Sequence, residues 1–267
     1  MGFSATSADN CFFIKNVGNS VEYVLIYVDD ILYISDQSSK CNDFANELGR
    51  HFSLKILGKV DKYLGVQITK TAKGFQLSQK DKILELLQKC NMVNAKTCET
   101  PMQPDFIKDM YNEAEAFKDN TLYRSTIGSL LYIANWTRPN IALPVNLLSR
   151  HVGNPTVYHW EAIKRVLRYL KHSADACLSL EPENATRPTL TCYADADWAG
   201  DVKSRNSTSG YIFFLNNSPV HWYTGKQNLV ATSTTEAEYI CLSKAANNLV
   251  WGLMTCSQTY GQNPTTQ

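Results

Sequence analysis

Residues 21–35 read VEYVLIYVDDILYIS, and this stretch decides the fold that we expect. Its two apolar runs are rich in Val, Ile, Leu and Tyr, which favour β-strands, and only Asp29 and Asp30 separate them. The run CFFIKN (11–16) just upstream is equally strand-like. The pattern therefore predicts a β-hairpin over residues 11–35, with two adjacent aspartates between its apolar runs.

Asp29 and Asp30 are the most informative pair for chemistry. Two adjacent carboxylates between apolar strands repel each other and lose hydration unless a cation neutralises them. Mg²⁺ prefers oxygen ligands, and phosphoryl transfer uses such carboxylates to hold a divalent metal against phosphate. The alternative is structural, because aspartate tolerates turn conformations and the pair can simply form a turn. The pair alone leaves both interpretations open.

Outward from this hairpin, helical spacing alternates with short strand-like runs. The expected elements are, in chain order, a helix over 37–50; a β-meander from FSLKIL (52–57) through YLGVQITKT (63–71) and GFQLS (74–78); a helix from Ser78; a polar linker over 97–120; helices over 121–173 with a break at Arg138–Pro139; a second linker over 181–188; three strands from 189; and a helix from Ser233 or Thr234 to about Met254.

Two further acidic positions lie near the C-terminus. Asp195 closes a strand-like run in YADADWAGD (193–201), and Glu238 lies on the final expected helix. Glu236 and Glu238 are two residues apart, so they cannot share a helix face and only one would reach a site. The structural alternatives are an acidic strand end followed by a turn at Asp195, and a helix N-terminus whose dipole favours Glu236.

A basic surface is expected on the helix WEAIKRVLRYLKH (160–172). Its apolar residues have i, i+3, i+4, i+7 spacing, which places the basic residues on the opposite face. Such a face is either simply solvated or contacts a nucleic-acid backbone. The four residues are Lys164, Arg165, Arg168 and Lys171.

Composition narrows the class of protein. The 267 residues allow roughly two domains, and a formal net charge of +1 leaves nucleic-acid binding to local patches. No apolar run approaches the roughly eighteen residues of a membrane span, and no secretory signal opens the chain. The eight cysteines are scattered singly, which disfavours structural zinc and predicts a reducing, intracellular location, cytoplasmic or nuclear. The start MGFSATSADN has the look of a cut end.

Taken in order, these segments resemble the Pol polyprotein of copia-type long-terminal-repeat retrotransposons from about residue 11 onward. The similar blocks are YVDDILYIS (27–35) to the polymerase palm hairpin, LGKVDKYLGVQI (57–68) with Leu64 and Gly65 to the primer grip, LSQKDKILELL (77–87) to the start of the thumb, YRSTIGSLLYIANWTRPNIA (123–142) and AIKRVLRYLK (162–171) to the connection, and YADADWAGDVKSRNSTSGYIFF (193–214) and ATSTTEAEYICLSKA (231–245) to ribonuclease H. One block would be modest support, but several in the same order are strong.

The resemblance implies an α+β fold in three parts. These are a partial polymerase palm over 1–77, thumb and connection helices over 78–185, and a truncated ribonuclease H-like α/β domain over 186–267. It implies Mg²⁺ as cofactor and an RNA/DNA hybrid or duplex as partner, with any remaining Pol segments supplied by another chain. Asp29 and Asp30 are the implied polymerase metal ligands. Asp195 and Glu238 are the implied ribonuclease H carboxylates, with Glu236 as the fallback.

The departures from the family pattern predict little or no activity for this chain alone. A further palm aspartate is expected upstream, yet before Asp29 the only acidic residues are Asp9 and Glu22, in no matching motif. A further ribonuclease H aspartate is expected after the long helix, yet no Asp or Glu follows Glu238. Two alternatives to a reverse transcriptase–ribonuclease H fragment remain: a non-catalytic nucleic-acid-binding or interaction remnant, and a reading frame without a stably folded product.

Overall fold

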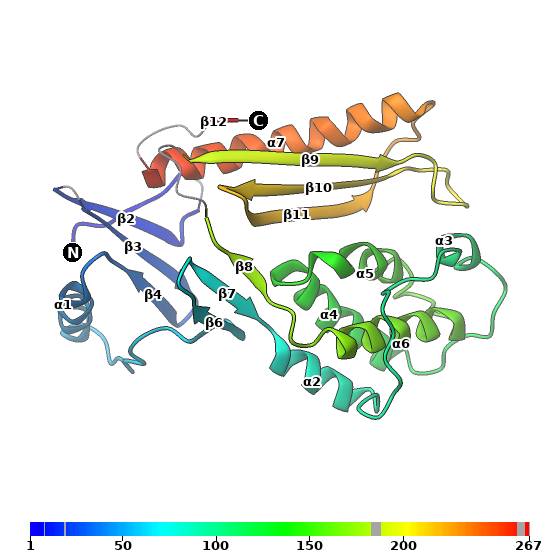
Figure 1. Ribbon diagram of the computed structural model, residues 1–267, viewed down its shortest axis with the longest axis horizontal. Helices are drawn as coiled ribbons and strands as arrows, with labels where there is room; N and C mark the ends of the chain where they lie inside the picture. The colour runs from blue at the N-terminus through cyan, green and yellow to red at the C-terminus, as the bar shows by residue number, and fades with distance from the viewer. Residues whose placement is uncertain (8, 19, 183–187, 261–264, 267) are drawn as a thin grey trace. The chain divides into compact units, whose positions relative to one another are not determined.

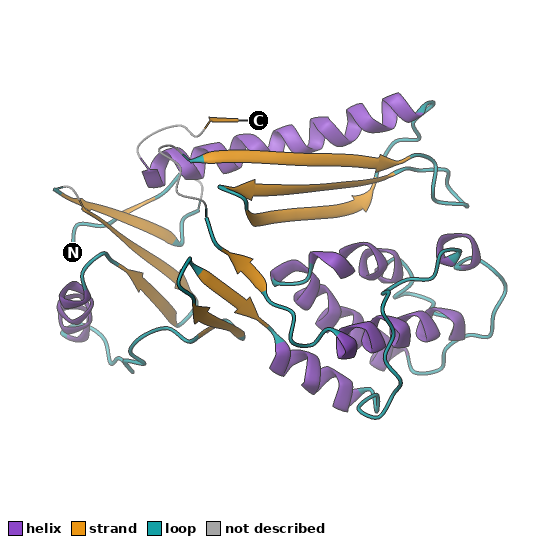
Figure 2. Cartoon of the chain, in the orientation of Figure 1, coloured by secondary structure: helices purple, strands orange, loops and turns teal. Residues whose placement is uncertain are grey.

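The computed structural model describes residues 1–7, 9–18, 20–182, 188–260 and 265–266. The chain folds as two compact units: a first unit of residues 1–64 and 247–265, and a second unit of residues 65–246 and 266–267. Helices and strands are mixed along the chain, as Figures 1 and 2 show, which confirms the expected α+β class. Of the second expected linker, 181–188, residues 183–187 lie outside the described residues.

The first unit is built on an antiparallel sheet with the strand order β1-β2-β3-β4. Helix α1 contacts this sheet through Phe44, whose ring stacks on Tyr33 with 4.3 Å between ring centroids. Strand pairing joins Tyr27 to Asp30, so the hairpin between β3 and β4 turns at Val28 and Asp29, and Asp30 already begins β4. The elements are β1 (Ser4–Ala5), β2 (Phe12–Val17), β3 (Ser20–Tyr27), β4 (Asp30–Ile34), α1 (Ser38–Gly49) and β5 (Lys62–Tyr63).

The expected strand at FSLKIL (52–57) is wrong. Residues 51–61 are all described and contain no helix or strand. Phe52, Ile56 and Leu57 are more than half exposed. Strand propensity reports how well a side chain fits a half-buried pleated surface, and these side chains have no such surface to cover. The rest of the meander is confirmed.

In the second unit, β6 pairs with β7, and β7 pairs with β8, a strand that follows the helices in the sequence. The predicted boundary at residue 77 or 78 therefore falls inside one structural unit. The elements here are β6 (Val66–Lys70), β7 (Phe75–Ser78), α2 (Lys80–Lys89), α3 (Phe106–Asp109), α4 (Asn120–Trp136), the 3₁₀ turn η1 (Pro139–Ile141), α5 (Ala142–Ser149), α6 (Val157–His172) and β8 (Leu178–Leu180).

The core of the second unit lies among α2, α4, α5 and α6. Tyr123, Leu130 and Leu167 are among its fully buried side chains, and the Tyr123 hydroxyl donates to the Leu148 carbonyl at 2.9 Å. The expected break between helices is confirmed at Arg138, which is 3% exposed and donates from Nη1 to the Ser173 carbonyl at 2.8 Å.

A second antiparallel sheet and the first part of a long helix complete this unit. Strands β9 (Thr189–Asp197), β10 (Thr208–Leu215) and β11 (Ser218–Lys226) pair with β10 in the centre, and residues 234–246 of α7 (Thr234–Tyr260) lie against this sheet, where the Cys241 thiol donates to the Asp195 and Gly210 carbonyls. The buried residues Ala237, Cys241 and Ala245 are four apart on α7, and small residues at this spacing let a helix approach a sheet closely. The two-residue strand β12 (Thr265–Thr266) follows.

Candidate functional site

The tip of the β3–β4 hairpin presents two carboxylates to solvent. Asp29 lies in the turn, Asp30 is the first residue of β4, and both are exposed. Val28 beside them is 85% exposed and has φ +56°. A β-branched residue with positive φ is a genuine outlier, and such strain gathers at functional sites. The turn is therefore held in a costly conformation that presents the carboxylates.

Relieving this strain gives a direct prediction. Replacing Val28 by asparagine, which adopts a left-handed conformation at lower cost, should raise the free energy of unfolding by about 1 kcal/mol. Chemical denaturation followed by far-ultraviolet circular dichroism measures this free energy of unfolding. Val220→Asn is the matched control, because Val220 is also an exposed valine but has no positive φ. A Val28→Asn variant less stable than the wild type would contradict the assignment of strain.

Tyr63 is electrostatically coupled to this tip. Burial raises the pKa of its hydroxyl, and the negative charge of Asp30 raises the pKa further, followed by the effect of Tyr27. The hydroxyl therefore remains protonated at neutral pH and can act as a hydrogen-bond donor close to the carboxylate pair.

The other acidic residues upstream of the hairpin are engaged elsewhere. Glu22 is 7% exposed and lies 3.6 Å from Lys40 and 3.9 Å from Lys15, which neutralise it. The Asp9 carboxylate accepts a hydrogen bond from the Cys11 amide at 2.7 Å. Within the described residues, no group of three or more His, Cys, Asp or Glu side chains is placed to hold a metal ion. The Asp29–Asp30 oxygens have the right chemistry for Mg²⁺ but form only a partial ligand set.

Leu64 and Gly65 form a tight turn with positive φ at both residues, +49° and +77°. Glycine adopts this conformation without steric cost. A Cβ atom added to Gly65 would lie 3.0 Å from the Tyr132 hydroxyl, so the Tyr132 side chain on α4 would have to shift to admit it. The two residues thus fix a backbone corner, whereas their primer-grip role stays a prediction.

At the second expected site, Glu236 and Glu238 lie in different surroundings, and the role of either residue stays a prediction. Asp195 is exposed on β9, and its carbonyl accepts a hydrogen bond from the Cys241 thiol at 3.1 Å. Glu238 lies three residues before Cys241 and is half-buried, so it shares the side of α7 that approaches Asp195. The Glu236 carboxylate instead accepts from the Thr232 hydroxyl at 2.7 Å and the Thr232 amide at 2.6 Å, which lowers its pKa. Glu236 therefore stabilises the start of the helix.

The basic face of α6 is covered in part by the segment before α3. Arg165 donates to the Thr100 hydroxyl at 2.7 Å, and Lys171 donates to the Ala95 carbonyl at 2.8 Å. Lys164 pairs with Glu161 at 2.5 Å, and all four basic side chains, including Arg168, are only partly exposed. Their expected role in nucleic-acid binding stays a prediction.

Sequence reasoning missed a groove between α2 and α4. It has a volume of about 540 Å³. Small residues on α4 widen it. On α2, Lys82 pairs with Glu85 at 2.7 Å, and Lys89 adds a positive charge that suits a sugar–phosphate chain. The spacing of Ser125, Gly128 and Ser129 along one helix face was the available signal. The lining residues are Lys82, Glu85, Leu86, Lys89, Ser125, Gly128, Ser129, Tyr132 and Ile133.

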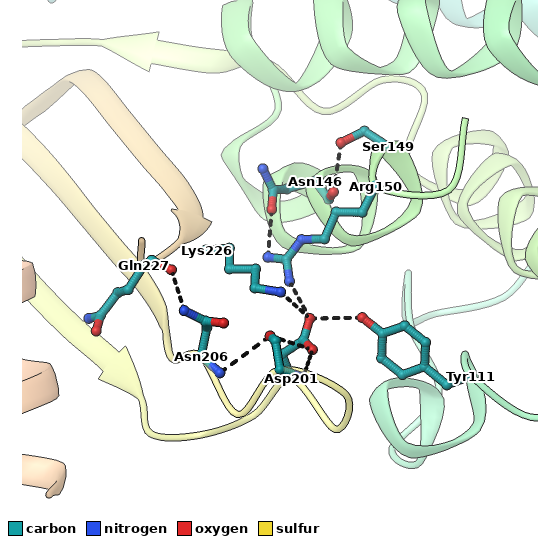
Figure 3. Close-up of polar contacts among 9 residues, drawn as sticks. Tyr111, Asn146, Ser149, Arg150, Asp201, Asn206, Lys226 and Gln227 are labelled. Carbon is teal, nitrogen blue, oxygen red and sulfur yellow. Dashed lines mark hydrogen bonds and ion pairs between the residues drawn. The ribbon is translucent and has the colours of Figure 1, made fainter. Parts of the chain in front are cut away.

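Sequence reasoning also missed the buried partners of Asp201, whose side chain is 1% exposed. One carboxylate oxygen accepts from the Tyr111 hydroxyl at 2.7 Å and lies 3.1 Å from the Lys226 ammonium and 3.5 Å from the Arg150 guanidinium (Figure 3). Burial alone would raise the pKa of Asp201, but hydrogen bonds from Ser204, Tyr111 and Lys226 outweigh it and hold the pKa well below its usual range. Asp201 is therefore a buried anion that joins the loop after β9 to α5.

No helix among the described residues has the length and apolar character needed to cross a lipid bilayer.

Comparison with known proteins gives a match to a family model and several similar transposon proteins. Residues 1–104 match the model of a reverse transcriptase (RNA-dependent DNA polymerase) family. The chain is 37% identical to the retrovirus-related Pol polyprotein from transposon RE1 of Arabidopsis thaliana over 94% of its own length, and spans 17% of that polyprotein. It is 33% identical to the putative transposon Ty5-1 protein of Saccharomyces cerevisiae, covering 91% of this chain and 79% of that protein.

Among solved structures, the chain is similar to a foamy viral protease-reverse transcriptase in complex with dsDNA. The TM-score is 0.45 and the sequence identity 17%, over 85% of this chain and 43% of that chain.

Proposed function

Because this chain belongs to the family of copia-type retrotransposon Pol polyproteins, in the region that carries the reverse transcriptase domain, we propose that it is a reverse transcriptase–ribonuclease H fragment. The reactions of such a fragment's parent are RNA-directed DNA synthesis and hydrolysis of the RNA strand of a hybrid. The observation that carries the proposal is the strained hairpin tip with Asp29 and Asp30 exposed side by side.

In this proposal, Asp29 and Asp30 hold Mg²⁺ at the polymerase site, and Asp195 and Glu238 hold it at the ribonuclease H site. Bound Mg²⁺ would neutralise phosphate charge and stabilise the attacking and leaving oxygens. The protein's own contribution in this proposal is to present Asp29 and Asp30 at the tip of the β3–β4 hairpin, Asp195 on β9 and Glu238 on α7.

We expect a polypeptide of these 267 residues to extend a primer at no more than background rate. Each site holds only two of the carboxylates that a two-metal clamp requires, so metal occupancy and phosphate alignment are both lost. Primer extension on an RNA template and cleavage of an RNA/DNA hybrid, each with Mg²⁺, measure this. Extension that Asp30→Asn abolishes, or cleavage that Asp195→Asn abolishes, would overturn the expected inactivity.

Nucleic-acid binding is the part of the function that this chain can retain, and we assign it to the groove between α2 and α4. Replacing both Lys82 and Lys89 by glutamine should weaken binding of an RNA/DNA hybrid and reduce the slope of log K against log salt by about 1–2. Fluorescence anisotropy at several salt concentrations measures both quantities. Lys108→Gln is the control, since Lys108 is exposed and outside the groove.

The alternative, a non-catalytic remnant that binds through the basic face of α6, makes a different forecast. Neutralising Lys164, Arg165, Arg168 and Lys171 would then reduce the salt slope while the Lys82/Lys89 variant leaves it unchanged. The contacts of Arg165 and Lys171 with the segment before α3 favour the groove.

A further inference from the structure

A small cavity of about 130 Å³ lies among α5, α6 and the segment that leads into α3. In Figure 1 this segment runs beside α6 before it reaches α3. The Cys98 thiol donates to the Arg165 carbonyl at 3.4 Å and so holds the segment on the helix. The lining residues are Pro101, Met102, Gln103, Phe106, Pro144, Leu148, Tyr158, Glu161, Ala162, Arg165, Val166 and Arg168.

Three polar atoms of this lining are buried without a hydrogen-bond partner among the described residues. They are the Tyr158 hydroxyl oxygen and the Nε atoms of Arg165 and Arg168. Leaving a buried donor unsatisfied costs about 1–3 kcal/mol, and more for a charged group. Three such atoms on one cavity point to an occupant that accepts hydrogen bonds.

The charges of the lining favour an anion. Arg165 and Arg168 contribute two positive charges. The one acidic lining residue, Glu161, already pairs with Lys164 at 2.5 Å. The Arg165 head group is fixed by its bond to Thr100, so its Nε cannot readily turn to solvent. An incoming anion would meet donors that are already positioned, which lowers the entropic cost of binding.

The remaining walls are apolar and set the size of the ligand. Met102, Phe106, Leu148 and Val166 are among the cavity's apolar lining residues. An apolar cavity of about 150 Å³ holds a benzene-sized molecule, so the cavity here has room for one ring or a branched aliphatic group.

We propose that this cavity binds a small organic monoanion, an aromatic or branched-chain carboxylate, with its carboxylate on Tyr158, Arg165 and Arg168 and its apolar group against Phe106 and Leu148. The site is separate from both carboxylate sites and from the groove between α2 and α4. It gives the helical part of this chain a ligand-binding role that does not depend on nucleic acid.

Titration of the full chain with benzoate, followed by isothermal calorimetry and by thermal shift, tests the proposal. Saturable binding at one site is expected, and Arg168→Gln should weaken it about tenfold through loss of a charge-assisted hydrogen bond. Ala162→Leu keeps every charge but fills the cavity, so it should abolish binding. Lys108→Gln removes a positive charge outside the lining, where Lys108 pairs with Asp105, and should leave binding unchanged.

Three outcomes would overturn the proposal. Equal affinities for benzoate and for benzyl alcohol, its neutral analogue, would show that the site does not require an anion. Inorganic phosphate binding as tightly as benzoate, with Ala162→Leu unaffected, would leave a simple phosphate site instead. Loss of hybrid binding in Arg168→Gln without any benzoate binding to the wild type would return these arginines to nucleic-acid contact. Because Ala162→Leu tests the cavity independently, misfolding of Arg168→Gln does not decide the question.

Discussion

Replacing Asp201 by alanine should lower the free energy of unfolding of the second unit by about 3 kcal/mol, since removing one partner of a buried ion pair typically costs 3–5 kcal/mol. The Asp201 carboxylate forms ion pairs with both Lys226 and Arg150, and it accepts a hydrogen bond from the Tyr111 hydroxyl. Its other oxygen accepts from the Ser204 amide at 2.9 Å and the Ser204 hydroxyl at 2.8 Å. Without it, two cations face each other and several donors lose their acceptor.

The measurement is denaturant unfolding at pH 7, supported by a thermal shift of roughly 10 °C for a unit of this size. Asp175→Ala is the matched control, because Asp175 pairs with Lys80 at 2.6 Å while its side chain is 85% exposed. An exposed pair contributes about 0–1 kcal/mol. Similar stability of the Asp201→Ala and Asp175→Ala proteins would show that the buried network contributes nothing measurable.

Lowering the pH from 6.5 to 4 should destabilise the second unit by about 2 kcal/mol through His151. Burial lowers the pKa of His151 to about 4, and the nearby charges of His159, Lys203 and Arg150 lower it further, against the opposing effect of Asp201. The unfolded chain, with a pKa near 6.5, therefore takes up the proton first as the pH falls. Stability is full above about pH 6.5 and is lost progressively toward pH 4.

His159 adds to the effect in the same direction. Its ring stacks on that of His151 with 3.9 Å between centroids, and burial lowers its pKa. Its Nδ1 accepts from the Thr156 amide at 3.0 Å, so Nε2 carries the proton that is donated to the Met110 carbonyl at 2.8 Å. Protonation of Nδ1 would break the contact that caps α6.

Unfolding free energies at pH 7, 5.5 and 4.5 test this dependence. His151→Phe keeps an aromatic ring on His159 but cannot titrate, so its stability should fall less steeply with pH. His172→Gln, an exposed histidine at the end of α6, should keep the wild-type slope. Equal slopes for His151→Phe and the wild type would contradict the assignment.

Local pattern predicted much of this fold because the deciding information was local. The two apolar runs of VEYVLIYVDDILYIS predicted the β3–β4 hairpin, and the spacing of Ile163, Val166, Leu167 and Leu170 predicted α6, whose four apolar residues are all fully buried. The strand expected at FSLKIL failed because forming it depends on a neighbouring strand, which no local pattern reveals. The pairing of β7 with β8 was missed for the same reason, since about a hundred residues separate the two strands.

The candidate sites likewise include residues that the sequence predicts and residues whose partners come from distant parts of the chain. Asp29, Asp30 and Asp195 stand out in sequence because they follow strand-like apolar runs, and Glu238 was singled out by the resemblance of its helix to ribonuclease H. Asp201 lies in the same acidic segment as Asp195, yet its partners Tyr111, Arg150 and Lys226 come from three separate parts of the chain. The cavity beside α6 could not be predicted from the sequence, because it forms only where the distant segment at Thr100 covers part of the basic face.

The Asp201 network has a consequence for exchanging modules between related elements. The Asp201 carboxylate joins the loop after β9 to α5 and to the loop after α3. A crossover between Arg150 and Asp201 therefore takes the carboxylate from one parent and its partners Tyr111 and Arg150 from the other. A chimaera joined there will be stable only when the donor brings an acid to position 201. Junctions that transfer residues 111–226 as a block keep Asp201 with all of its partners, so these junctions are the ones to use for building hybrid polyproteins.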